Sequence, residues 1–72
     1  MPVLAAKDVL AKAQLALSES TVYALREVVI RSEGDTLVLV GQVSSFYHKQ
    51  LAQELVRQHD EGLEVVNTIH VL

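Results

Sequence analysis

The chain has 72 residues, half of them apolar, with no cysteine and a formal net charge of −3. This length predicts a single small domain that buries only about 60% of the surface its unfolded chain exposes. Six lysines and arginines are too few for the basic face that phosphate contacts require, so no nucleic-acid partner is expected. The lack of cysteine excludes disulfides and thiolate zinc sites.

The first half of the chain predicts a helix and then a short strand. Residues 4–17 have the helical period, because their apolar side chains share one face of a 100° wheel. A β-branched apolar run then predicts a strand over residues 27–32. Residues 22–26 are good helix formers, and they could instead continue a helical turn.

A turn containing glycine and aspartate leads into the second expected strand, residues 36–43. Side chains alternate along a strand, so Leu37 and Leu39 are expected on the face opposite to Val38. A glycine inside a strand marks a bulge or a close approach of the backbone, and Gly41 is expected to let a helix lie near the sheet.

The second half of the chain predicts a helix over residues 46–59, N-capped by Ser44 and Ser45, and a strand over residues 63–72 with alternating apolar side chains. Helical period divides the helix into two faces. The expected inward side chains are Tyr47, Leu51, Ala52 and Leu55, and the expected outward ones are Phe46, Lys49, Gln53 and Arg57.

The order helix, strand, strand, helix, strand predicts one α+β domain over residues 1–72. We expect an αββαβ two-layer sandwich, with a three-stranded mixed sheet and both helices packed on one face. The second and third strands should be parallel, joined by a right-handed helical crossover; the rest of the strand order stays open. The expected core is Leu10, Leu17, Val28, Ile30, Leu37, Leu39, Val43, Leu51, Leu55, Ile69 and Val71.

Four runs of residues carry a family resemblance. They are Val28-Val29-Ile30, Leu37-x-Leu39-x-Gly41-x-Val43-Ser44-Ser45, Phe46-Tyr47-His48-Lys49-Gln50-Leu51-Ala52-Gln53-Glu54 and Gly62-Leu63-Glu64-Val65-Val66-Asn67-Thr68-Ile69-x-Val71. With the order of elements, these runs resemble the BON domain, and in particular its small stand-alone bacterial members. The resemblance implies a binding module that associates with phospholipid or another cell-envelope component.

The sequence gives two different expectations for the cellular location of the protein. The chain as given has no signal peptide and no run of about 18 apolar residues, which predicts a soluble, cytoplasmic protein without a transmembrane segment. The BON resemblance implies the cell envelope or the periplasm.

No constellation of side chains predicts catalysis or a cofactor. His48 and His59 stand eleven residues apart on one expected helix, about 16 Å along its axis, too far for two ligands of one metal. Ser44 and Ser45 are interpreted as helix caps, with no carboxylate placed to orient His48. We therefore expect no enzyme activity, no metal site and no cofactor.

Two surfaces are candidates for binding, and the sequence leaves the choice open. A phospholipid surface or envelope protein could contact Phe46, Lys49 and Arg57 on the second helix, or Lys7 and Lys12 on the first. Alternatively, a protein partner or a second copy of the chain could bind the helix-free face of the sheet. Its expected apolar residues are Val29, Val38, Val40 and Val66.

Overall fold

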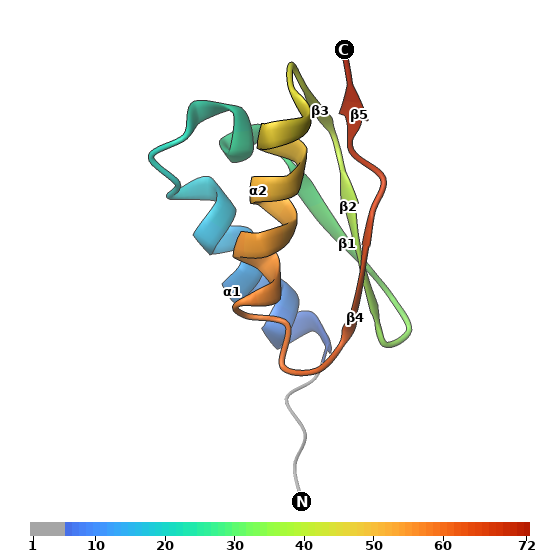
Figure 1. Cartoon of the computed structure of the whole chain (residues 1–72). Coiled ribbons are helices and arrows are strands. Elements are labelled where there is room, and N and C mark those ends of the chain that lie inside the picture. The colour runs from blue at the N-terminus through green and yellow to red at the C-terminus, as the bar shows by residue number, and fades with distance from the viewer. Residues whose placement is uncertain (1–5) are drawn as a thin grey trace, which may run out of the picture.

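A computed structural model of the protein describes residues 6–72 (Figure 1); residues 4 and 5 of the first expected helix lie outside the described part. The fold has the α+β architecture predicted from the sequence, with the three-stranded mixed sheet β1-β2-β4 and two helices covering one of its faces. The elements are α1 (Ala6–Ser18), η1 (Tyr23–Glu27), β1 (Val29–Glu33), β2 (Thr36–Val40), β3 (Gln42–Val43), α2 (Phe46–Arg57), β4 (Glu64–Asn67) and β5 (His70–Val71).

The segment before β1 takes the helical alternative, as a 3₁₀ helix. Leu25, which is 1% exposed, anchors η1 in the core, and its carbonyl accepts from the N–H of Val28 at 3.2 Å. This last turn delays β1 to Val29, two residues later than the sequence predicted. A two-residue turn then joins β1 to β2, with Gly34 at φ 62°, which is the conformation that a type II′ hairpin demands of its first residue.

The second and third expected strands are each interrupted, yet their parallel pairing continues across the interruptions. The N–H groups of Thr68, His70 and Leu72 donate to the carbonyls of Leu39, Gly41 and Val43, at 3.0, 2.8 and 2.9 Å respectively. The register that pairs β2 with β4 is therefore kept where β3 pairs with β5. One ladder runs the length of the domain.

Gly41 lies between β2 and β3, where a side chain would meet neighbouring backbone. Its φ is 152°, and a Cβ at this position would lie 3.4 Å from the Cα of Val28 and 3.7 Å from the carbonyl oxygen of Glu27. Glu27 is the last residue of η1, so the helix whose close approach Gly41 permits is this 3₁₀ helix, at the point where the chain leads into β1. The nearest atoms do not come from α1 or α2.

The buried core is entirely aliphatic. The parity predicted for β2 is confirmed, because Leu37 and Leu39 are both 0% exposed whereas Val38 and Val40 lie half-buried on the other face. Four residues expected in the core, Leu10, Leu51, Leu55 and Val71, are half-buried against it. The buried residues are Val9, Ala13, Leu17, Leu25, Val28, Ile30, Leu37, Leu39, Val43, Ala52, Val56 and Ile69.

The buried stripe of α2 is rotated relative to the expected one. Tyr47, expected inside, is 69% exposed, whereas Val56 is fully buried. The stripe is centred on Ala52 and Val56, one turn apart, because α2 packs against the sheet as well as against α1 and η1. Lys49 and Gln53, expected outside, are consequently half-buried beside β4.

Two side-chain amides join the helices to the sheet. Gln14 of α1 donates to the Val28 carbonyl at 2.9 Å and accepts from the Ile30 N–H at 2.8 Å. Asn67 of β4 donates to the Lys49 carbonyl of α2 at 2.9 Å. Half-buried amides of this kind are stabilising because both of their polar ends are satisfied.

Leu39→Ala is expected to lower the free energy of unfolding by about 2–5 kcal/mol, because it leaves a cavity in a core that has few other large side chains. Val29→Ala is the matched control, since Val29 is 53% exposed and its truncation should cost under about 0.5 kcal/mol. Urea titration followed by circular dichroism measures both. Equal midpoints for the two variants would contradict the assigned core.

Candidate binding surfaces

Every aromatic side chain of the protein is exposed. The chain has two tyrosines, one phenylalanine and no tryptophan, and Tyr23, Phe46 and Tyr47 are 78%, 75% and 69% exposed. Leu72, which follows β5, is 76% exposed. The segments η1, the start of α2 and β5 lie toward the same end of the molecule (Figure 1). We call Tyr23, Phe46, Tyr47 and Leu72 the aromatic end.

The rings of the aromatic end are held by local structure. Ser45 N-caps α2 as predicted, its Oγ accepting from the His48 N–H at 3.1 Å, so that Phe46 and Tyr47 are the first residues of a capped helix. The guanidinium of Arg26 lies 4.2 Å from the centre of the Tyr23 ring, a cation–π contact. Arg26 is itself fixed through its Nε, which donates to the Ser20 carbonyl at 2.7 Å.

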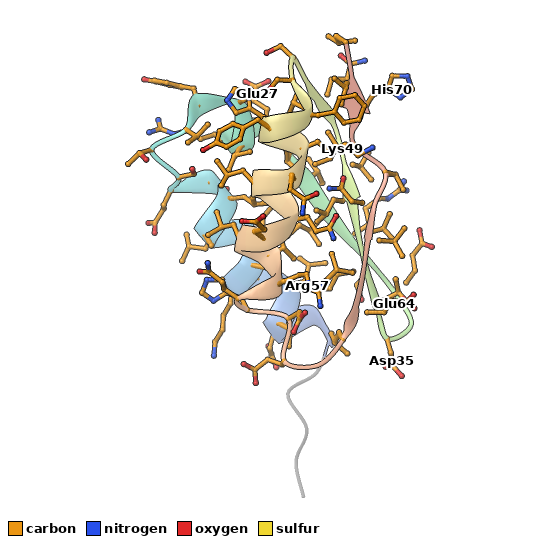
Figure 2. The ribbon with its side chains drawn as sticks, in the orientation of Figure 1. Glu27, Asp35, Lys49, Arg57, Glu64 and His70 are labelled. Atoms are coloured by element: carbon orange, nitrogen blue, oxygen red, sulfur yellow. The ribbon has the colours of Figure 1, made fainter. Side chains whose placement is uncertain are left out.

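Acidic residues gather at the opposite end of the domain. Asp35 and Glu64 lie there, at the hairpin tip and the start of β4, whereas Glu27, Lys49 and His70 lie toward the aromatic end (Figure 2). The segment from Thr36 to Val43 separates the two ends by about 23 Å, at about 3.3 Å per residue. This distance exceeds the Debye length of about 8 Å at physiological salt, so the acidic end hardly influences a charged surface at the aromatic end.

The structure brings together only part of the set predicted to contact lipid. Phe46 and Lys49 lie within one turn of each other, although Lys49 is half-buried. Arg57 is exposed but about 12 Å further along the axis of α2. Lys12 is exposed on α1, and the side chain of Lys7 lies outside the described part. The sequence did not predict Tyr23, Tyr47 or Leu72 as contact residues. The small number of aromatic residues was the one signal that it offered.

The helix-free face of the sheet carries the predicted valines. Val29 and Val66 are 53% and 39% exposed, while Val38 and Val40 are half-buried between them. We call these four residues the valine face. Three strands of about five residues offer only about 240 Å² of planar surface. A stable dimer buries about 800 Å² on each partner, so this face alone supports weak association.

Two open grooves border the helices on their outer side. One, of about 280 Å³, lies at α1 and the end of α2, and Lys12 and His59 are part of its rim together with Leu15, Ala16 and Glu19. The other, of about 230 Å³, separates α2 from the segment leading into η1. Its lining residues are Ser20, Thr21, Val22, Leu25, Leu51, Glu54, Leu55 and Gln58.

The three histidines lie on different segments: His48 in the first turn of α2, His59 just after its end and His70 in β5. His48 and His59 are half-buried and His70 is exposed. The Nδ1 atom of His48 is buried without a hydrogen-bond partner. Within residues 6–72, no three His, Cys, Asp or Glu side chains are grouped so that they could hold a metal ion.

Neither described helix has the length and apolar character needed to cross a bilayer. Comparison of the chain with protein-family models and with curated proteins gave no match. The surfaces themselves, and above all the aromatic end, are therefore the basis for assigning a function.

Zinc is expected to be substoichiometric in protein purified without chelators, because no three His, Cys, Asp or Glu side chains among residues 6–72 are grouped as metal ligands. Elemental analysis measures it, with His48→Ala as the comparison. One zinc per chain that is lost in this variant would show that the imidazoles do form a metal centre.

Proposed function

We propose that the protein is a non-catalytic binding module of the BON type, which associates with a phospholipid surface through its aromatic end. The single observation that carries the proposal is that the core contains no ring, while Tyr23, Phe46 and Tyr47 are all at least 69% exposed on elements at one end of the fold. Amphipathic rings favour the boundary between headgroups and acyl chains. The αββαβ order is also the one that the BON resemblance implies.

The relative sizes of the apolar and the electrostatic contributions predict how salt would affect such binding. Burying a Phe or Leu side chain fully gains about 1.5–3 kcal/mol, whereas a basic residue near an anionic membrane contributes about 1 kcal/mol. Apolar contact by Phe46 and Leu72 therefore outweighs attraction by Arg26 and Lys49. Binding should be weakened by salt without being abolished.

Phe46→Ser combined with Tyr47→Ser is expected to reduce partitioning onto vesicles at least about tenfold, because two rings are removed from the contact. Co-sedimentation with vesicles of mixed zwitterionic and anionic phospholipid measures the bound fraction. Leu15→Ser is the matched control, since Leu15 is 56% exposed but lies on α1, away from the aromatic end.

Charge reversal at Lys49 and Arg57 should lower the same partitioning only a few-fold and flatten its dependence on salt. An equal loss in the Leu15 variant, or full binding without the two rings, would place the contact elsewhere and contradict the proposal.

A second candidate function is docking of a protein partner, or of a second copy, on the valine face. It is favoured by the adjacency of Val38 and Val66, which are register partners on neighbouring strands, and by the 53% exposure of Val29. The small area of the face limits self-association to a weak dimer.

Val38→Glu with Val40→Glu should shift a concentration-dependent dimer toward monomer while the domain stays folded, because both side chains point away from the helices. Sedimentation velocity over a range of concentrations, with circular dichroism as the folding control, measures this. A parent protein that is monomeric at every concentration would remove the homodimer from consideration.

A further inference from the structure

The two edge strands of the sheet, β1 and β4, differ in whether their outward backbone groups are hydrogen-bonded. On β1, the amide of Gln14 donates to the Val28 carbonyl at 2.9 Å and accepts from the Ile30 N–H at 2.8 Å. These are backbone groups of the kind that would otherwise pair with an added strand. A helix side chain thus blocks this part of the β1 edge, a common protection of exposed strands.

The edge formed by β4 is open. The N–H groups of Thr68, His70 and Leu72 donate toward β2 and β3. Backbone groups alternate in direction along a strand, so those of Val65 and Asn67 point out of the sheet. Within the described residues, no further strand or helix lies beyond β4 (Figure 1). Two N–H groups and two carbonyls are therefore free to pair with a further strand.

The side chain of Asn67 does not close this edge. Its Oδ1 accepts from the Ile69 N–H at 3.1 Å, and its Nδ2 donates to the carbonyl of Lys49 and to Oε1 of Gln53 at 2.9 and 3.2 Å. These bonds turn the chain between β4 and β5 and hold α2 beside the edge. The side chain of Asn67 therefore makes no hydrogen bond to the outward backbone groups of Val65 or Asn67.

Positive charge borders the open edge on its helix side. Lys49 and Arg57 lie on the side of α2 nearest β4 and β5 (Figure 2), with Gln53 between them contacting Asn67. Their backbones are about 12 Å apart along the helix axis. In an extended chain, two residues four positions apart are separated by about this distance, and their side chains lie on the same face of the strand.

We propose that the outer edge of β4 binds an extended segment of a partner protein as a fourth strand, with two acidic side chains four residues apart that face Lys49 and Arg57. Backbone pairing with Val65 and Asn67 would supply the affinity, and the spacing of the acidic residues would supply the specificity. The alternate side chains of the segment lie on the face of Glu64, where apolar or basic residues fit. None of the residues of this site belongs to the aromatic end, although Phe46 and Tyr47 lie on the same helix as Lys49 and Arg57.

The test uses a fluorescent nine-residue peptide with two glutamates four residues apart, threonine midway between them and valine at the alternate positions. Its control has the same composition but glutamates three residues apart, which places them on opposite faces. Fluorescence anisotropy should show at least tenfold tighter binding of the first peptide. Charge reversal at Lys49 and Arg57 should remove this preference, and Phe46→Ser with Tyr47→Ser should leave it unchanged.

Two further measurements locate the contact. Val65→Pro deletes one outward N–H and should abolish peptide binding while circular dichroism remains that of the parent. Amide chemical shifts of the unmodified protein, titrated with the peptide, should change most at Val65 and Asn67. Equal affinity for both peptides, no binding at millimolar peptide, or shifts centred on β1 or on the aromatic end would each overturn the proposal.

Discussion

The parallel pairing of residues 36–43 with residues 64–71 is the constraint on which the rest of the fold depends. Parallel strands require a crossover, and α2 provides it on the face where α1 also packs. The register buries Leu37 and Leu39 and turns Val38 outward; a slip of one residue would exchange the two sets. It also decides which backbone groups of β4 are used within the sheet and which point away from it.

The proposed function follows from the position of the Phe and Tyr side chains, which lie outside the core. Aliphatic side chains alone fill the buried interior, with Leu17, Leu37 and Leu39 at 0% exposure. The aromatic rings, which could each gain about 1.5–3 kcal/mol by burial, instead remain in water on η1 and α2. Exposed rings contribute little to the stability of so small a domain, so we interpret them as a binding surface. The valine face, by contrast, is small and partly covered by its own neighbours.

Much of the fold was predictable from the sequence, because period and alternation act locally. The strand over 36–43, its parity and the cap at Ser45 are all read from neighbouring residues. What escaped prediction depends on distant partners. Gln14 meets backbone groups 14 and 16 residues away. The rotation of α2 that buries Val56 reflects packing against five elements at once, namely α1, η1, β3, β4 and β5.

The same distinction between local sequence and distant contacts applies to the candidate surfaces. The position of Val38 and Val40 on the helix-free face was predicted correctly, because these residues alternate with the buried leucines of β2. The exposure of Tyr47 was not predicted, because the helical wheel placed its side chain on the inward face of the helix. Tyr23 belongs to a 3₁₀ helix whose position depends on the burial of Leu25, a tertiary contact.

Amide hydrogen exchange in the free protein tests the central claim, that one continuous parallel ladder organises the domain. Slow exchange is expected for Thr68, His70 and Leu72, whose N–H groups donate to Leu39, Gly41 and Val43. Fast exchange is expected for Val65 and Asn67, whose N–H groups point out of the sheet. The opposite alternation, or uniform fast exchange beyond Asn67, would contradict the register and the open edge together.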